Sequence, residues 1–194
     1  MKKRKITDIP TAEQLKKELS RLNYKKTFRS TLFNTFASLA VTIAVVALLS
    51  VFLFPILRVT GQGMNPTLTS DELVLCNKTA QARKGDIIAF YHNKKILLKR
   101  VIGISGDVID ISDNGTVFVN GEYLDEPYVS SNALGECDLT FPYTVPTNRY
   151  FVMGDNRVDS VDSRSSAVGC VAEENIIGRI YVIVWPFEKL GVPD

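Results

Sequence analysis

The chain has 194 residues, of which 45% are hydrophobic and 23% charged, and its formal net charge is +2. This composition excludes an intrinsically disordered or fibrous protein, and the length allows one modest domain with a small additional element. The charge is uneven: residues 1–29 contain ten Lys and Arg against three Asp and Glu, residues 30–57 contain none, and residues 58–194 contain thirteen basic against eighteen acidic residues. The acidic balance of residues 58–194 excludes nucleic acid as a partner, and the apolar segment before them excludes an ordinary cytosolic enzyme.

The uncharged segment 30–57 predicts a transmembrane anchor. It contains an apolar run over residues 40–49 and a second one over residues 51–54. About 20 apolar residues in a helix cross a bilayer core of roughly 30 Å, and a buried core helix would rarely extend over 28 residues without a charge. A cleaved signal peptide would have an apolar run of only about 7–15 residues close to the N-terminus, so we expect an uncleaved anchor in the lipid bilayer.

The basic residues before the anchor predict its orientation. Because Lys and Arg flanking a membrane span stay on the cytoplasmic side, residues 1–29 are expected to form a cytoplasmic basic segment. The chain is then a single-pass protein of the cell membrane with a cytoplasmic N-terminus. Residues 58–194 form an extracellular domain.

A helix start is also predicted before the anchor. Thr11 occupies the N-cap position after Pro10, and Gln14 follows three residues later. Leu15, Leu19 and Leu22 share one face of the expected helix. This segment is either a short interfacial or partner-binding helix, or a solvated helix that only sets the topology.

Short apolar segments separated by turn residues predict a β-rich domain after the anchor. The expected strands are residues 73–75, 87–91, 96–104, 108–111, 117–119, 150–153 and 180–185. Asn114-Gly115 is a hairpin dipeptide and predicts that residues 108–111 pair with residues 116–120. Residues 126–147 are rich in Pro, Ser and Asn and are expected to form a long external loop. The expected fold class is therefore mainly β, a barrel or sandwich on one N-terminal transmembrane helix.

The cysteines and the single histidine do not indicate a metal site. There is no C-x-x-C motif, and His92 lies in a polar turn between two apolar segments, so we expect neither a metal nor a cofactor. A disulfide between Cys137 and Cys170 is chemically allowed outside the membrane, but the sequence does not establish that they are close. Cys76 lies in an apolar segment and is expected to be a free buried thiol.

Three segments carry residues suited to chemistry. In residues 59–68, two glycines and a proline form a shaped turn directly after the anchor, where backbone can approach a ligand. Lys99 lies in an apolar strand, where burial would lower its pKa and make it a general base; the alternative is an edge-strand lysine that reaches water. Residues 153–164 are dense in polar groups, and form either a solvated loop or a hydrogen-bonded support for a site.

Together, in this order, these segments resemble the bacterial type I signal peptidases from the anchor to about Trp185. The family motif S-G-x-S-M-x-P-T-L is similar to residues 60–68, with Gly63 at the position of the nucleophilic serine. The motif K-R-V-I-G-x-P-G-D is similar to residues 99–107, with Ser105 in place of proline. The motif G-D-N-R-x-x-S-x-D-S-R matches residues 154–164 throughout.

The resemblance implies a membrane-bound endopeptidase with a Ser/Lys dyad that removes signal peptides from secreted preproteins. Lys99 would be the general base, Ser160 would orient its amine, and Asp162 and Arg164 would form a supporting ion pair. The backbone N–H of Gly63, with help from Gly61, would line the oxyanion hole. The signal peptide would bind as an extended strand, in shallow apolar pockets shaped by Val59, Met64, Leu68, Leu97 and Leu98.

Glycine has no side-chain oxygen, so Gly63 cannot form an acyl-enzyme and we expect negligible peptidase activity. In one interpretation the chain is a signal peptidase whose serine has been replaced. In another it is a non-catalytic relative that binds pilin subunits and assists the assembly of pili or surface proteins. A third interpretation, a membrane-tethered structural β-domain, predicts that Lys99 titrates normally. The retained Lys99, Ser160, Asp162 and Arg164 favour the first, because a buried lysine without a duty costs desolvation energy.

Overall fold

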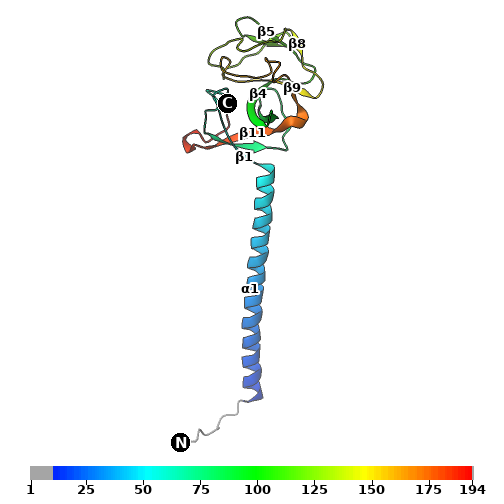
Figure 1. The fold of residues 1–194 in the computed structure, drawn as a ribbon. Helices are drawn as coiled ribbons and strands as arrows, with labels where there is room; N and C mark the ends of the chain where they lie inside the picture. The colour runs from blue at the N-terminus through cyan, green and yellow to red at the C-terminus, as the bar shows by residue number, and fades with distance from the viewer. Residues whose placement is uncertain (1–10, 194) are drawn as a thin grey trace. The chain divides into compact units, whose positions relative to one another are not determined.

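The first unit of the chain is dominated by one long helix. The computed structural model describes residues 11–193, with a boundary between two units at Ser50 and Val51. Helix α1 spans Ala12–Leu53, buries none of its residues within the chain, and is long and apolar enough to cross a bilayer (Figure 1). Residues 1–10 of the predicted cytoplasmic segment lie outside the described residues.

The start and end of α1 follow from local sequence. The N–H of Thr11 donates to Gln14 Oε1 at 3.0 Å, as a capping motif requires. The predicted helix after Thr11 is continuous with the anchor and is not a separate short element. At the other end α1 stops at Leu53, because Pro55 lacks the N–H that would continue the helix. Ile56 and Leu57, the last residues of the predicted anchor, belong to strand β1.

The second unit consists of two antiparallel sheets. A seven-stranded sheet has the order β1-β2-β11-β3-β4-β9-β10, and a four-stranded sheet has the order β7-β6-β5-β8. The strands are β1 Ile56–Arg58, β2 Leu73–Asn77, β3 Ile87–His92, β4 Lys95–Gly103, β5 Val108–Ile111, β6 Val117–Val119, β7 Glu122–Tyr123, β8 Tyr143–Thr144, β9 Arg149–Met153, β10 Val171–Ala172 and β11 Ile176–Trp185. Short 3₁₀ helices η1 Glu173–Asn175 and η2 Phe187–Lys189 flank β11.

The predicted fold class is confirmed. All seven expected strands are present, as β2, β3, β4, β5, β6, β9 and β11. The predicted hairpin is formed by β5 and β6, which pair Ile109 with Val119. Strands β1, β7, β8 and β10 were not predicted. Strand β1 continues the apolar run of the anchor, and the other three have only two residues each, too few to show an alternating pattern. One of them, β8, interrupts the predicted loop over residues 126–147.

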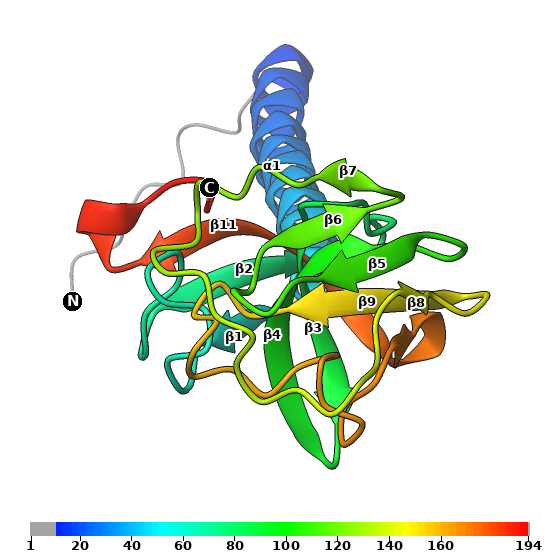
Figure 2. The ribbon, with the colours of Figure 1, turned by 90° about the horizontal axis from the view of Figure 1, so that it is seen from above.

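A shared hydrophobic core joins the two sheets. Ile102 of β4 and Phe151 of β9 pack with Ile109 of β5 in one buried cluster. Figure 2 shows the strands of the four-stranded sheet, β5 to β8, lying beside one another. The approach is close at Gly103, where a Cβ atom would lie 2.6 Å from Ile109 Cδ1. A separate cluster buries Leu68 under the turn of residues 59–68 and holds that turn against the seven-stranded sheet.

Lys99 lies on an interior strand of the seven-stranded sheet. Strand β4 pairs with β3, where Lys99 is opposite Ile88, and with β9, where Arg100 is opposite Met153. The alternative of an edge-strand lysine that reaches water is wrong, because the Lys99 side chain is buried. Because the chain leaves β9 at Met153, residues 154–164 begin beside the lysine.

The structure shows the state of the three cysteines and the position of the single histidine. Cys76, Cys137 and Cys170 are all free thiols, so the allowed Cys137–Cys170 disulfide is not formed. Cys76 is fully buried, as expected, in the core cluster beneath the turn of residues 59–68. His92 ends β3 at a turn. Within residues 11–193, no group of three or more His, Cys, Asp or Glu side chains is arranged to hold a metal ion.

Phe151 tests the core that joins the sheets. A Phe151→Ala substitution removes a completely buried ring and should lower the free energy of unfolding by about 3–5 kcal/mol. Phe187→Ala, at a ring that is 71% exposed, is the matched control and should cost less than about 1 kcal/mol. Urea unfolding of the full chain in detergent micelles measures both. Equal effects of the two substitutions would contradict this description of the core.

Candidate active site

The turn that contains Gly63 faces Lys99. A Cβ atom built on Gly63 would lie 2.9 Å from Lys99 Nζ and 3.7 Å from Ser160 Oγ. The lysine amine is the flexible end of a long side chain and needs to move only a few tenths of an ångström to accept a small side chain at position 63. The structure therefore brings together the two positions that the motifs predict to form the dyad.

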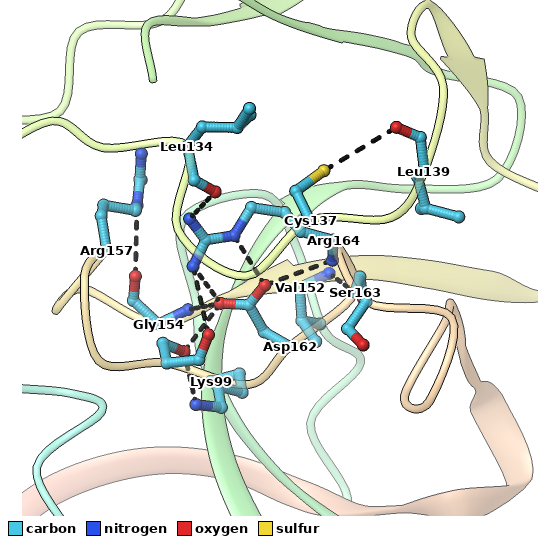
Figure 3. Close-up of polar contacts among 12 residues, drawn as sticks. Lys99, Leu134, Cys137, Leu139, Val152, Gly154, Arg157, Asp162, Ser163 and Arg164 are labelled. Carbon is cyan, nitrogen blue, oxygen red and sulfur yellow. Dashed lines mark hydrogen bonds and ion pairs between the residues drawn. The ribbon is translucent and has the colours of Figure 1, made fainter. Parts of the chain in front are cut away.

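A chain of hydrogen bonds holds the lysine amine. Lys99 Nζ donates to Ser160 Oγ at 2.6 Å, and Ser160 Oγ donates to Asp162 Oδ2 at 2.7 Å (Figure 3). All three side chains are buried, with Lys99 only 6% exposed. The serine hydroxyl therefore holds the lysine amine in place.

A buried ion pair supports this chain. Arg164 binds Asp162 through both carboxylate oxygens, Nε to Oδ1 and Nη2 to Oδ2, each at 2.9 Å. The N–H of Gly154 also donates to Asp162 Oδ2 at 2.9 Å, and Arg164 Nη1 donates to the carbonyl of Leu134 at 2.7 Å (Figure 3). Neither charged side chain has any exposed surface. Across residues 11–193, every buried side-chain nitrogen and oxygen has a hydrogen-bond partner.

The surroundings of the site lower the pKa values of both Lys99 and Asp162. Burial lowers the pKa of Lys99 below its ordinary value of 10.5, and the negative charge of Asp162 only partly offsets this effect. Burial alone would raise the pKa of Asp162, but the hydrogen bonds and charge of Arg164 outweigh it and hold that pKa below its ordinary value. Lys99 can therefore lose its proton more readily than an exposed lysine, as a general base must.

A groove of 140 Å³ opens beside the amine. It is lined by Leu57, Arg58, Val59, Thr60, Gly61, Gly63, Met64, Ile96, Leu97, Leu98 and Lys99. Four of the five residues predicted to shape substrate pockets belong to this lining. The fifth, Leu68, does not: it is completely buried in the core beneath the turn. Its apolar side chain supports the groove from below and does not face it.

Backbone groups near Gly63 are held in place by neighbouring polar groups. The N–H of Asn156 donates to the Gly63 carbonyl at 3.2 Å, and Ser70 Oγ donates to the Gly61 carbonyl at 2.7 Å. Gly61 has a φ of +83°, a conformation that suits glycine. Among the described residues, no acceptor receives the N–H of Gly63. That N–H is available to a ligand in the groove.

A second buried network was missed at the level of sequence. Arg100 binds Asp155 through Nε at 2.9 Å and Nη2 at 2.7 Å, and Thr67 Oγ1 donates to Asp155 Oδ2 at 2.5 Å. The guanidinium of Arg100 also lies 3.8 Å from the centre of the Tyr128 ring. This network ties the Gly63 turn to β4 and to residues 154–164. Arg100 and Asp155 both lie within the motif segments 99–107 and 154–164, and this position in the motifs was the signal that could have revealed them.

A third ion pair links the same polar segment to the long loop. Arg157 Nη1 donates to Glu126 Oε2 at 2.9 Å, and Tyr128 donates its hydroxyl proton to Glu126 Oε1 at 2.8 Å. Arg157 Nε also donates to the Gly154 carbonyl at 3.1 Å. Nothing in the loop sequence marked Glu126 or Tyr128 as partners of the site.

Comparison with known proteins identifies the family. The family model described as signal peptidase, peptidase S26, matches residues 32–185. The chain belongs to the S26 signal peptidase family. Signal peptidase I of Bacillus licheniformis is 32% identical over 180 residues, covering 86% of this chain and 95% of the relative. Signal peptidase I T of Bacillus subtilis is 38% identical over 167 residues, covering 78% of this chain and 85% of the relative.

Two further S26 matches come from other bacteria. Signal peptidase IB of Staphylococcus aureus is 33% identical over 172 residues, covering 78% of this chain and 88% of the relative. A crystal structure of a signal peptidase I from Enterococcus faecalis is 31% identical and has a TM-score of 0.44, covering 52% of this chain and 97% of that one. The S26 match includes all three segments that form the site described above.

The buried ion pair should contribute far more to stability than an exposed one. Arg164→Met leaves the carboxylate of Asp162 buried without its partner and should lower the free energy of unfolding by about 3–5 kcal/mol. The matched control is Arg58→Met, because Arg58 forms an exposed pair with Asp71 at 2.8 Å and should contribute about 1 kcal/mol or less. Urea denaturation measures both. A small effect of Arg164→Met would show that water reaches Asp162.

The lowered pKa of Lys99 predicts a pH-dependent stability. The unfolded chain keeps the lysine proton up to about pH 10.5, whereas the folded protein releases it at lower pH. The cost of burying this amine is therefore complete below the lowered pKa and vanishes as the pH rises to about 10.5. The free energy of unfolding, compared with that of Lys99→Met, should rise across this window by at most about 1.4 kcal/mol per pH unit. Urea titrations at several pH values check the sign, and a difference that falls or stays constant would contradict it.

Proposed function

We propose that this chain is a membrane-anchored protein of the signal peptidase I class that binds signal peptides of preproteins but lacks its nucleophile, because Gly63 occupies the serine position. The observation that carries this proposal is the distance of 2.9 Å between Lys99 Nζ and a Cβ atom built on Gly63. A hydroxyl at that position would lie within hydrogen-bond reach of the amine.

The remaining groups have the arrangement that serine acylation requires. In a protein with a hydroxyl at position 63, neutral Lys99 would take the hydroxyl proton while the oxygen attacks the scissile carbonyl. Ser160 holds the amine by its 2.6 Å hydrogen bond, and Asp162 and Arg164 hold Ser160 in turn; these three are positioning residues. The N–H of Gly63 would stabilise the oxyanion. Without the hydroxyl, loss of one member of comparable triads costs about 10⁴–10⁶ in turnover, so cleavage by this chain is negligible.

The groove supports recognition of an extended peptide with small side chains. Strand β9 pairs with β4 only from Arg100 onward, and no described strand pairs with residues 96–98 on that side. An extended peptide can therefore add to this open edge through backbone hydrogen bonds. Val59, Met64, Leu97 and Leu98 make the adjoining groove apolar and narrow, which favours small side chains before the cleavage site.

The anchor places this function at a membrane surface. Helix α1 carries the basic residues of its first half on the side of the apolar segment that the positive-inside rule assigns to the cytoplasm. The β-rich unit is then extracellular, where preproteins emerge. The lipid bilayer is the second partner, and neither a metal nor a cofactor is required by the proposed chemistry.

Restoring the hydroxyl tests the proposal. Gly63→Ser in the full chain, in detergent micelles with a preprotein, should raise cleavage after a small residue at least about 10³-fold over the Gly63 protein. Gly63→Ala is the matched control, because it adds the Cβ atom without the hydroxyl and should remain inactive. Adding Lys99→Met to Gly63→Ser should abolish the restored cleavage. Product masses and initial rates measure all four proteins.

The outcome separates cleavage from assembly. If the Gly63→Ser protein folds normally and binds preprotein but leaves it intact, the peptidase proposal fails. Binding of pilin subunits, measured with the unaltered chain in the same micelles, would then favour the assembly role.

A further inference from the structure

The lone pair of the Lys99 amine is not used by the serine that holds it. A hydroxyl has one proton, and Ser160 donates its proton to Asp162 Oδ2 at 2.7 Å. Asp162 is bound by Arg164 through both oxygens and is therefore an ionised acceptor. Ser160 can only accept from Lys99, so the hydrogen bond at 2.6 Å uses an N–H of the amine. When Lys99 is neutral, its lone pair remains for another group.

The space beside this amine is open because position 63 has no side chain. A Cβ atom there would already lie 2.9 Å from Nζ, and glycine leaves that volume to the groove. Its walls near the amine are apolar, with Met64, Leu97 and Leu98 in the lining. The charge of nearby Arg58 is neutralised by Asp71 at 2.8 Å. A small neutral electrophile can therefore approach the nitrogen without displacing a side chain.

We propose that Lys99 is a covalent attachment site for short apolar aldehydes that enter this groove. The amine lone pair forms a C–N bond to the carbonyl carbon, the C=O π pair moves to oxygen, and one N–H proton is transferred to that oxygen. The resulting carbinolamine loses its hydroxyl and the second N–H proton as water, leaving a C=N imine. Amine and aldehyde thus become imine and water, with no oxidant or reductant.

Burial of the amine favours this reaction, because the reaction needs the neutral form of the lysine. Only the neutral amine is a nucleophile, and burial lowers the pKa of Lys99, so a larger fraction of it is neutral than of an exposed lysine. The groove volume of 140 Å³ limits the aldehyde to a short chain. The inference goes beyond peptide cleavage, because it needs neither a signal peptide nor a hydroxyl at position 63.

Reductive labelling of the full chain tests this site. The protein in detergent micelles is incubated at pH 7 with pentanal and cyanoborohydride, which converts the imine to a stable secondary amine, and each lysine is quantified by peptide mass mapping. Lys94 and Lys95 are internal references, because they lie at the exposed tip of the β3–β4 hairpin. Lys99 should be labelled faster than either, by about tenfold for each unit by which burial lowers its pKa. After denaturation the three rates should be equal.

A matched pair of serine substitutions tests the geometry. Gly63→Ser places a hydroxyl proton on the lone pair and should reduce Lys99 labelling at least about fivefold, since the hydrogen bond competes with attack. Gly191→Ser adds the same group where a Cβ atom meets nothing within 4 Å and should leave labelling unchanged. Labelling of Lys99 no faster than of Lys94 and Lys95 in the folded protein would overturn the proposal, as would equal labelling in the Gly63→Ser protein. These readouts are independent of preprotein cleavage, so either proposal can fail alone.

Discussion

The hydrogen bond from Lys99 to Ser160 is the interaction on which the rest of the site depends. Lys99 is only 6% exposed, and burying its amine without a hydrogen-bond partner would cost free energy. Ser160 provides that partner: it donates its own proton to Asp162 and therefore accepts a hydrogen bond from Lys99. The direction of every hydrogen bond from Arg164 to Lys99 is therefore determined, and so is the side on which the amine meets the groove.

The buried ion pairs of residues 154–164, the polar segment after β9, hold parts of the chain in position more than they stabilise the fold. Residues 154–164 contribute a charged residue to each of three ion pairs, with Asp155, Arg157 and Asp162 all buried. Replacing buried pairs by apolar residues is often neutral or stabilising, so such a concentration of charge is a poor way to stabilise a fold. It does connect three separate parts of the chain, the Gly63 turn, β4 and the long loop, to one short segment. We infer that these pairs hold the relative positions of Gly63 and Lys99.

Features set by neighbouring residues could be predicted from the sequence, whereas contacts between residues far apart in the chain could not. The longer strands were predicted because alternation of apolar residues is a local property, and Gly63, Lys99 and Ser160 because they lie in short motifs. Their approach to one another depends on the pairing of β4 with β9, which no local pattern encodes. Glu126 and Tyr128 were missed for the same reason, since their partner Arg157 is 31 residues from Glu126 in the chain. Leu68 was placed in the groove by its motif, whereas the core beneath the turn takes its side chain.

Glycine at position 63 leaves the amine of Lys99 without a hydroxyl partner on its groove side. In a protein with a hydroxyl at this position, the amine lone pair would receive the hydroxyl proton, and the cost of burying the lysine would be offset by that bond. Here the amine is held in the same way from behind but faces an open groove in front. The free energy spent on burying and orienting Lys99 therefore gives the chain a positioned, unprotected nucleophile. In the function proposed above, the groove lacks serine chemistry because position 63 has no hydroxyl, and the amine of Lys99 is the nucleophile that lines it.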